Sequence, residues 1–392
     1  MTSAPAGPPE RPPRRGRPRR RRSSFRINGR GWVYLVLAAS VAFAAAFKDN
    51  NLLFAVFSLL MGLFAACGWL TWIGARGLEI SRALPESVHA GDLFLVGLRI
   101  RNARRFWPAA GLRLEDRLSH EGRPAGAPPP PVWLPAISPG ASASAAYSLS
   151  IAERGWARLG PLTVVSEFPP GLFTCRKVVP LEDAILVYPR LGVLHRRPAS
   201  RLFARLSSVT ATPAAARRGN EDFAGLREYR PGDSPRHIDW KRSARLPRAL
   251  LVREYEDVQT RDAAILLETF LPDAQDPRRR GRLERAVSFA ATLADALLAE
   301  RYRVRFRACG PEPFTLLLEP RPGALEDLLH ALATLKPSRV LRLTDLVRDE
   351  PPGTDEVYFL LRLTSEPLPP WEGAARAIEL GPQDMRNLMT FA

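Results

Sequence analysis

Two long uncharged runs near the start of the chain constrain its fold more than any other feature. Residues 31–47 form a run of 17 residues without a charged side chain, and residues 52–73 form a second run of 22. At about 1.5 Å per helical residue they measure roughly 25 and 33 Å, close to the roughly 30 Å of a bilayer's hydrocarbon core. Four polar residues, Lys48 to Asn51, join the runs. The sequence therefore predicts a transmembrane helical hairpin over residues 31–74.

Arginine is distributed asymmetrically around the two runs. Residues 1–30 carry ten Arg against the single acid Glu10, and Arg76 and Arg82 follow the second run, whereas the connecting turn has one Lys and one Asp. Lys and Arg concentrate in the cytoplasmic flanks of membrane helices. We therefore expect the soluble residues 75–392 to face the cytoplasm from the cell's inner (cytoplasmic) membrane.

Two other interpretations of the first run stay open. Ala42 to Ala44 resembles the small-residue site at which a signal peptide is cleaved, and the paired Arg before Ser23 resemble a twin-arginine signal. The run is longer than the usual apolar segment of a signal peptide, and a second full-length run follows at once, which favours an uncleaved hairpin. Four aromatic residues fall toward one side of the pair, as an interfacial belt does: Trp32, Tyr34, Trp69 and Trp72.

The net charge of +17 comes largely from the first 30 residues, where ten Arg and one Glu give +9. The other residues carry +8, an ordinary excess, so no specific nucleic acid is expected as a partner. Pro, Gly, Ser and Arg without apolar periodicity are typical of a disordered segment that lies on anionic lipid. RNA binding by the tail (residues 1–30) is the alternative, although no aromatic residue interleaves with its Arg before Phe25.

The Cys and His residues give no sign of a metal centre. Cys67 lies in an apolar run, and Cys175 and Cys309 are far apart in sequence. Their spacing matches no zinc motif and asks for no oxidising compartment. The five His residues are equally scattered, which makes a metallohydrolase a poor fit, and we expect no cofactor.

Short alternating runs predict an all-β domain over residues 75–195. Turn signals such as Ala90-Gly91-Asp92 and Ser138-Pro139-Gly140 separate the runs. The number and length of the runs favour a β-sandwich. The apolar positions that share a strand face are Phe94, Val96, Leu98 and Ile100, then Tyr147, Leu149 and Ile151.

Strand and helix patterns alternate over residues 259–392. Buried-type strands are expected at residues 263–267, 302–306, 314–318, 357–361 and 377–380. Apolar residues at helical spacing predict a helix between the first two strands, and residues 325–335 predict another. This alternation indicates an α/β domain of Rossmann type with a mostly parallel sheet.

A charged segment over residues 196–258 lies between the two domains. Its part from Gly219 to Glu256 mixes seven acidic and eight basic residues with aromatic ones such as Tyr229 and Trp240, so we expect it to be folded. Pro231-Gly232-Asp233 is a tight-turn signal. Four residues around the turn are candidates for interlocking ion pairs: Arg236, Asp239, Lys241 and Arg245.

Three roles for this segment stay open. It fastens to the α/β sheet through a strand at residues 250–254, or it docks a partner through exposed residues such as Arg230. Catalysis by Asp233 or Asp239, as in a hydrolase, is the third. No nucleophile, His base or phosphate-binding loop accompanies these two carboxylates, which disfavours catalysis.

The charged segment resembles the signature of the domain of unknown function 58 family. Asn50 to Leu53, Arg154-Gly155 and Pro170 to Phe173 resemble the same family, so the likeness covers nearly the whole chain after the tail. The signature positions are Phe223, Gly225, Leu226, Arg227, Tyr229, Pro231, Gly232, Asp233, Arg236, Ile238, Asp239, Trp240, Lys241, Ser243, Ala244 and Arg245.

The resemblance implies a bacterial membrane protein with two membrane helices, a β-rich domain and a C-terminal von Willebrand A-like domain. It also implies association with a MoxR-type AAA+ ATPase, which assembles or activates other proteins. No enzymatic activity is established for the family, so we expect a non-enzymatic adaptor or scaffold that contacts lipid through its two helices and its Arg-rich tail. Neither the client protein nor the oligomeric state follows from the sequence.

The chain departs from the metal-binding von Willebrand A pattern. That pattern places Asp-x-Ser-x-Ser after the first strand, where its oxygens bind Mg²⁺. Here Glu268, Thr269 and Phe270 follow the strand at residues 263–267, and Pro272 comes next. Phe270 and Pro272 offer no side-chain oxygen. We therefore expect a degenerate site that does not hold metal.

Overall fold

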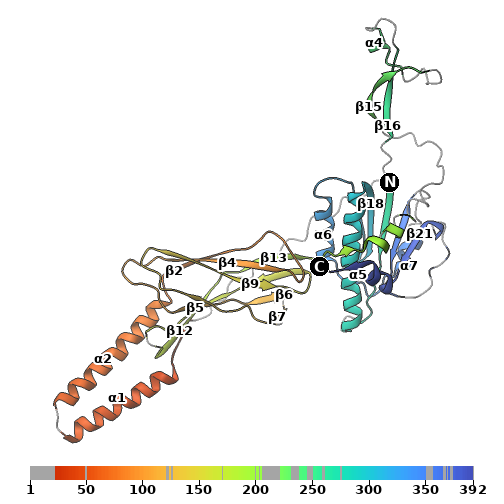
Figure 1. Ribbon diagram of the computed structural model, residues 1–392. Helices are drawn as coiled ribbons and strands as arrows, with labels where there is room; N and C mark the ends of the chain where they lie inside the picture. Colours follow the sequence, from red (N-terminus) through yellow and green to blue (C-terminus); the bar gives the residue numbers. More distant parts are fainter. Residues whose placement is uncertain are drawn as a thin grey trace. The chain divides into compact units, whose positions relative to one another are not determined.

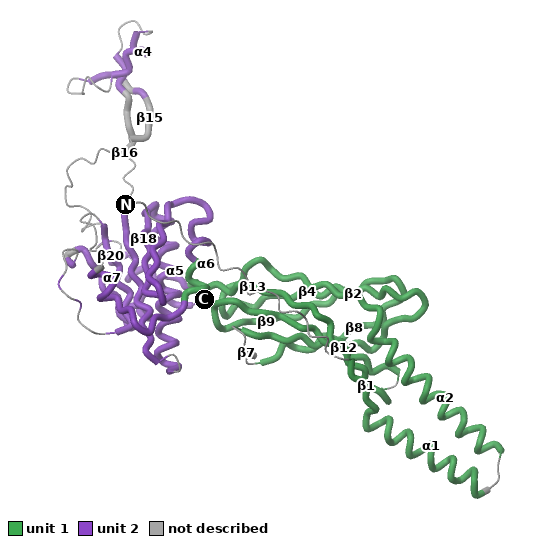
Figure 2. Tube along the Cα trace, turned by 180° about the vertical axis from the view of Figure 1, so that it is seen from behind, with its two compact units in different colours: residues 1–191, 329–335 green, residues 192–328, 336–392 purple. Residues whose placement is uncertain are grey.

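The computed structural model divides the chain into two compact units, unit 1 with residues 1–191 and 329–335 and unit 2 with residues 192–328 and 336–392 (Figure 2). It describes residues 23–48, 51–120, 123–124, 127–169, 171–198, 200–202, 204, 221–230, 238–244, 250–257, 261–273, 276–349, 356–364, 368, 370 and 374–391. Most of the predicted Arg-rich tail lies outside these ranges.

Unit 1 begins with two apolar helices, α1 (Gly29–Lys48) and α2 (Asn51–Gly74), which pack side by side as a hairpin (Figure 1). Both are long and apolar enough to cross a membrane. Their bounds lie within two residues of the predicted runs, because uncharged residues extend the helices until polar residues interrupt them. The prediction of two apolar helices is confirmed.

The end of the tail is structured, which corrects the expectation of disorder up to residue 30. Strand β1 (Ser24–Ile27) pairs antiparallel with β12 (Phe173–Val179). The ring of Phe25 stacks on that of Phe173, with centroids 5.1 Å apart. Strand pairing and aromatic stacking therefore order the four residues of β1.

The loop before β12 packs between the two helices. Leu172 and Phe173 are buried there and form an apolar cluster with Cys67 of α2. Asn28, just before α1, donates from its backbone N–H to the Leu172 carbonyl (2.8 Å) and from Nδ2 to the Gly171 carbonyl (2.9 Å). These contacts join both helices to the β-sheets of unit 1.

Gly31 tests this junction, because a Cβ there would lie 2.5 Å from the Leu172 carbonyl oxygen and 2.6 Å from Ile27 Cγ2. Gly31→Ala should cost about 1–3 kcal/mol by overpacking, measured as a lower melting temperature of the full-length chain in detergent. Gly29→Ala is the matched control, since a Cβ at Gly29 has no neighbour within 4 Å. Equal melting of the two variants would contradict the close packing of α1 on this loop.

The strands of unit 1 form three sheets. The first sheet has the order β1-β12-β11-β5-β8, the second β3-β13-β10-β6-β7, and the third β2-β4-β9. The bounds of the strands not yet given are β2 (Leu78–Ala83), β3 (Val88–His89), β4 (Leu93–Asn102), β5 (Leu112–Glu115), β6 (Leu118–His120), β7 (Arg123–Pro124), β8 (Val132–Leu134), β9 (Ser142–Ser150), β10 (Gly155–Leu159), β11 (Leu162–Ser166) and β13 (Asp183–Tyr188).

One apolar core lies among the three sheets. In β4 the side chains of Val96, Leu98 and Ile100 are buried and alternate with more exposed neighbours, as the sequence pattern predicts. Tyr147 and Leu149 of β9 join the same core. Residues 329–335 also belong to unit 1.

Three of the chain's crossings between the first and second sheets lie together. β5 leads into β6 through Asp116, β10 into β11 through Gly160, and β12 into β13 through residues 180–182. The Gly160 N–H donates to the Arg117 carbonyl (2.7 Å), and a Cβ on Gly160 would overlap the Leu181 carbonyl. Glycine is therefore required where these crossings touch.

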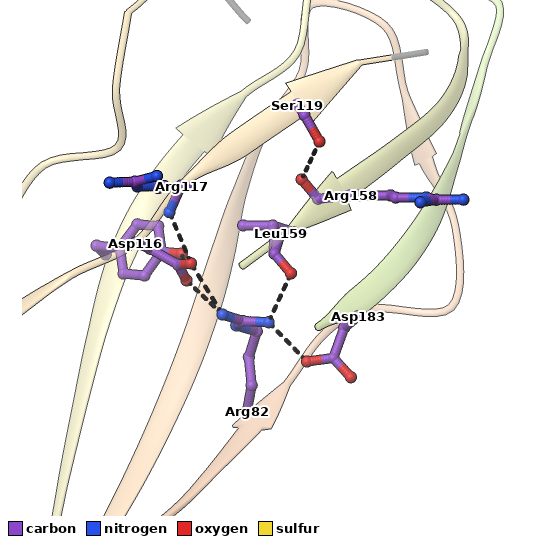
Figure 3. A network of polar contacts seen from close by, with 8 residues as sticks. Arg82, Asp116, Arg117, Ser119, Arg158, Leu159 and Asp183 are labelled. Atoms are coloured by element: carbon purple, nitrogen blue, oxygen red, sulfur yellow. Dashed lines mark hydrogen bonds and ion pairs between the residues drawn. The ribbon is translucent and has the colours of Figure 1, made fainter. Parts of the chain in front are cut away.

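A buried arginine of the third sheet binds all three crossings (Figure 3). Arg82 of β2 donates to both carboxylate oxygens of Asp116 (2.9 and 2.7 Å), to the Leu159 carbonyl (3.2 Å) and to Asp183 Oδ2 (2.6 Å). Tyr147 Oη donates to Asp116 Oδ2 (2.7 Å). We call Arg82, Asp116, Tyr147 and Asp183 the corner network.

The centre of the corner network is almost closed to water, whereas the side chain of Asp183 at its edge is 33% exposed. The side chain of Arg82 is 0% exposed and that of Asp116 is 2% exposed. Burial and the neighbouring Asp116 carboxylate raise the pKa of Tyr147, so the phenol stays protonated and continues to donate. Arg82, which the sequence analysis counts as a flanking charge of the membrane helices, is thus a buried structural residue.

Asp116→Ala should destabilise unit 1 strongly, because it leaves the buried Arg82 charge with one carboxylate fewer. Loss of one partner from a buried pair costs about 3–5 kcal/mol, which corresponds to a melting temperature lower by about 6 °C or more. Glu79→Ala is the control, since the Glu79–Arg101 pair is more than half exposed on both sides (62% and 59%) and should matter little. A melting temperature for Asp116→Ala equal to that of Glu79→Ala would contradict this role.

Unit 2 contains a five-stranded sheet of order β19-β18-β17-β20-β21 (Figure 1). Neighbouring strands are parallel except for the antiparallel pair β18 and β19, which agrees with the mostly parallel sheet that the sequence predicts. The strands are β17 (Arg261–Leu267), β18 (Tyr302–Cys309), β19 (Pro313–Leu318), β20 (Val357–Leu361) and β21 (Ala377–Leu380).

Helices cover this sheet. α7 (Leu343–Asp349) packs on Ala264 and Leu266 of β17, and alternate residues of that strand point to the opposite face. α5 (Pro277–Ala299) contacts β17 and β18, and its predicted apolar positions are all buried. Further elements are β14 (Val193–Leu194), a 3₁₀ turn (Ala374–Arg376), α8 (Pro382–Leu388), β22 (Met389–Thr390) and α6 (Ala324–Thr334), whose residues from 329 on belong to unit 1.

Candidate functional site

The family signature folds into a small antiparallel hairpin of its own. β15 (Glu221–Glu228) pairs with β16 (Leu251–Asp257), and the short helix α4 (Trp240–Ser243) lies before β16 (Figure 1). We call these three elements the signature hairpin. Its register shifts between Phe223 and Gly225, as at a β-bulge.

The pairing of β16 bears on one of the three roles left open for the charged segment, in which a strand at residues 250–254 fastens it to the α/β sheet. In the structure β16 pairs with β15, and the five-stranded sheet contains neither strand. A hairpin satisfies the backbone hydrogen bonds of both strands locally. Pairing with the sheet is therefore not what folds the signature segment.

Asp239 joins α4 to β16 through backbone groups. Its side chain caps α4 by accepting from the Arg242 N–H (3.2 Å), and its own N–H donates to the Leu251 carbonyl (2.8 Å). Ser243 Oγ accepts from the Leu251 N–H (2.9 Å). Asp239 and Ser243 are both buried, at 7% and 6% exposure. Asp239 therefore serves as a helix cap.

The residues beside these two buried positions are exposed. Trp240 is 63% exposed, and Lys241 and Arg242 follow it on the surface. Directly after β15, Tyr229 is 36% exposed, and Arg230 is exposed as well. The signature hairpin thus presents aromatic and basic side chains from a backbone held by buried polar groups.

The structure locates only part of the signature. Ile238 bridges to Val252 of β16, Leu226 is half-buried in β15, and Ala244 is exposed after α4. The side chains of Phe223 and Arg227 lie outside what the structure describes. So do the turn and two of the expected ion-pair partners: Pro231, Gly232, Asp233, Arg236 and Arg245.

A second candidate site lies at the carboxyl edge of the five-stranded sheet. The chain runs from β17 to β18 on one side and returns to β20 on the other, so the strand order reverses beside β17. Ligands of open α/β sheets bind at such a reversal, outside the carboxyl ends of the strands. Glu268 and Thr269, the residues of the degenerate metal pattern, stand at this point.

Protein groups occupy the oxygens of Glu268. Its Oε2 accepts from the N–H groups of Leu363 (2.6 Å) and Thr364 (3.0 Å), which follow β20, and its Oε1 accepts from Thr364 Oγ1 (2.9 Å). Glu268 is 3% exposed. The carboxylate therefore bridges the two strands on either side of the reversal.

The neighbours of Glu268 are also engaged. Thr269 Oγ1 donates to the Cys309 carbonyl at the end of β18, and Arg342 lies over the Phe270 ring, 4.8 Å from its centroid. Burial and the charge of Glu268 raise the pKa of Cys309 to about 12, so its thiol stays protonated at neutral pH. Among the described residues no group of three or more His, Cys, Asp or Glu is arranged for a metal ion.

Sequence reasoning missed the partners of Glu268 because they are 95 and 96 positions away and donate mainly through backbone N–H groups. Every residue type except proline carries a backbone N–H, so the sequence does not mark which residues donate from the backbone. The one side-chain signal was Thr364, a hydroxyl just after an apolar strand.

Glu268→Ala should destabilise the chain by about 3 kcal/mol or more, because two backbone N–H groups and a hydroxyl lose their acceptor and each costs about 1–3 kcal/mol when buried. Glu268→Gln should lose less, since its amide oxygen still accepts from both N–H groups. Thermal melting of the full-length chain tests this: the melting temperature should fall from the wild type to Glu268→Gln and further to Glu268→Ala.

The same variant tests the metal expectation. Calorimetric titration of the full-length chain with millimolar Mg²⁺, the weak end of oxygen-ligand sites, should give no saturable heat. Saturable binding that Glu268→Ala abolishes would contradict our assignment of Glu268 as a bridge between strands.

The described elements define the class of protein: it combines an apolar helical hairpin, an all-β part and an α/β unit that carries a small signature hairpin. Residues 225–347 match the model of the family described as "Protein of unknown function DUF58". The match includes α4, β16 and the first strands of the α/β sheet. The family resemblance drawn from the signature is confirmed.

One curated relative covers most of the chain. It is an uncharacterized protein, YeaD, of Bacillus subtilis (strain 168), 25% identical over 313 residues, which are 77% of this chain and 74% of the relative.

Similarity to solved structures is weak. The CARDB domain of a Pyrococcus furiosus protein aligns over 28% of this chain and 95% of its own length, at 12% identity and a TM-score of 0.19. A Listeria innocua β-glucosidase aligns over 28% of this chain and 16% of its own length, at 16% identity and a TM-score of 0.20. At these TM-scores neither likeness bears on fold or function.

Proposed function

We propose that this chain is a membrane-anchored, non-enzymatic adaptor that docks a MoxR-type AAA+ ATPase through its signature hairpin. The observation that carries the proposal is the contrast within that hairpin: Asp239 and Ser243 are buried and hydrogen-bonded to backbone, whereas Trp240 beside them is 63% exposed. The polar side chains at both ends of α4 thus bind backbone groups, and the aromatic side chain of Trp240 is left in water.

The exposed residues have the composition of a protein-binding surface. Trp, Tyr and Arg dominate the few interface residues that contribute most of the binding energy. Trp240, Tyr229 and Arg242 supply all three types on one small hairpin. Because the backbone beneath them is held, little conformational entropy is lost on binding. The MoxR-type identity of the partner rests on the family resemblance.

The finer fold and the location are part of the same proposal. We assign unit 2 to a von Willebrand A-like fold, supported by its mostly parallel five-stranded sheet and by the helices that cover it. We place α1 and α2 in the inner membrane and the soluble residues 75–392 in the cytoplasm, supported by the ten Arg of residues 1–30. In this arrangement the adaptor recruits the ATPase to clients at the membrane.

Trp240→Ala should abolish docking while the fold stays intact. Truncating a residue that dominates an interface costs about 2 kcal/mol or more, which is about thirtyfold in affinity. The measurement is the amount of MoxR-type ATPase that co-purifies with the full-length chain from membranes. Val340→Ala is the control, because Val340 is an 81% exposed apolar residue of unit 2 outside the hairpin.

Asp239→Ala separates fastening from docking. Loss of the cap should cost about 0.5–2 kcal/mol locally, so the amides of Arg242 and Leu251 should exchange hydrogen faster, and ATPase binding should fall with that loosening. Trp240→Ala should lower binding with no change in exchange. If the Trp240→Ala variant bound the ATPase as well as the wild type does, the signature hairpin would not be the docking surface.

A further inference from the structure

The loop between β4 and β5 is attached to the last turn of α2. Arg104 donates from Nη2 to the Gly74 carbonyl, from Nε to the Arg76 carbonyl (2.7 Å) and from Nη1 to the Pro108 carbonyl (3.1 Å). The rings of Trp107 and Trp69 meet edge to face, with centroids 5.3 Å apart. We call residues 103–108 the interfacial loop. Its position is fixed relative to a membrane-spanning helix.

The length of α2 sets the depth of this attachment. Its 24 residues measure about 36 Å at 1.5 Å per residue, about 6 Å more than the hydrocarbon core of a bilayer. The excess is about one turn. Trp69 and Trp72, near the end of α2, are of the type that marks the membrane–water boundary. The interfacial loop, which contacts Trp69, therefore lies at the level of the lipid headgroups.

The loop presents apolar rings to its surroundings. Phe106 is 75% exposed and Trp107 is 42% exposed, although both are large aromatic residues. Trp72 of α2 is 39% exposed, and Phe168 is 54% exposed just before the segment that packs between the helices. In water such a group of exposed rings is costly. At the headgroup level the rings are in their preferred environment.

Cations accompany these rings. The guanidinium of Arg76 lies 3.5 Å from the centroid of a Trp72 ring, and that of Arg105 lies 5.3 Å from the Phe106 centroid. Arg76 and Arg105 are both exposed. The interfacial loop contains no acidic residue. Exposed Arg beside aromatic rings matches phosphate oxygens above acyl chains, because the rings enter the lipid while the guanidinium groups stay at the phosphates.

We propose that the interfacial loop, with Trp72 and Arg76, is a lipid-binding surface for anionic phospholipid headgroups. It adds a loop between strands of unit 1 to the bilayer contacts of the two helices and of the Arg-rich tail. It rests on α1 and α2 spanning a membrane, and not on the proposed adaptor function. Its occupant is lipid because the surface continues directly from a helix that lipid surrounds.

The depth of Phe106 tests the proposal. The full-length Phe106→Cys variant is spin-labelled and placed in lipid nanodiscs, where collision with oxygen and with a water-soluble nickel chelate reports depth; the native Cys67, Cys175 and Cys309 are buried. Leu59→Cys in α2 is the lipid control and Leu95→Cys in β4 the water control, at 73% and 68% exposure. The label at 106 should give an oxygen-to-nickel ratio between those of the two controls.

The headgroup preference is tested in the same discs. Phosphatidylglycerol mixed with phosphatidylcholine should raise the ratio at position 106 above its value in phosphatidylcholine alone, and Arg76→Gln with Arg105→Gln should remove that rise. Arg99→Gln is the control, because Arg99 is an exposed arginine of β4; this variant should keep the rise.

Two outcomes would overturn the proposal. One is a ratio at position 106 equal to that at position 95 in both lipids. The other is a label at 106 that is aqueous in discs and becomes shielded only when a purified protein partner is added, which would make the loop a protein-binding surface. If α1 and α2 do not span the bilayer, the label at position 59 will itself read as aqueous.

Discussion

The buried guanidinium of Arg82 is the interaction on which the architecture of unit 1 depends. Three crossings of the chain between the first and second sheets meet beside it, and each ends a strand and leaves polar groups inside the protein. One planar cation with several donors, held by Asp116 and Asp183, binds polar groups at all three crossings. A lysine at this position would supply charge without the fork of donors. The corner network thus joins the three sheets of unit 1 at the places where their strands end.

Buried carboxylates elsewhere in the chain are used in the same way. Glu268 bridges two strands at the point where an open α/β sheet usually admits a ligand, and Asp239 caps the helix of the signature hairpin. Both lie where the sequence alone suggests chemistry. Each of them accepts from backbone N–H groups of a neighbouring segment. Two large aromatic side chains are exposed instead: Trp240 on the signature hairpin and Phe106 on the interfacial loop.

The sequence predicted the two apolar helices and the alternating buried positions of β4, because both depend on local periodicity. It also located the family signature, from short motifs at fixed spacing. It did not predict that Ser24–Ile27 form a strand, since the stabilising partner is Phe173, far along the chain. The roles of Arg82 and Glu268 were equally invisible. An arginine after a membrane segment looks like a topogenic charge, and a glutamate after a strand looks like a ligand, until distant donors and acceptors are in place.

The junction between α2 and the sheets has a mechanical consequence. Thr71 of α2 donates to the Phe168 carbonyl, and Arg104 holds the carbonyls at the end of the same helix. These contacts join the end of α2 to the sheets of unit 1 without a slack segment. Membrane helices tilt by about 20° on average, and by more when the bilayer thins. In the membrane arrangement proposed above, a tilt of α2 would therefore carry the attached sheets with it.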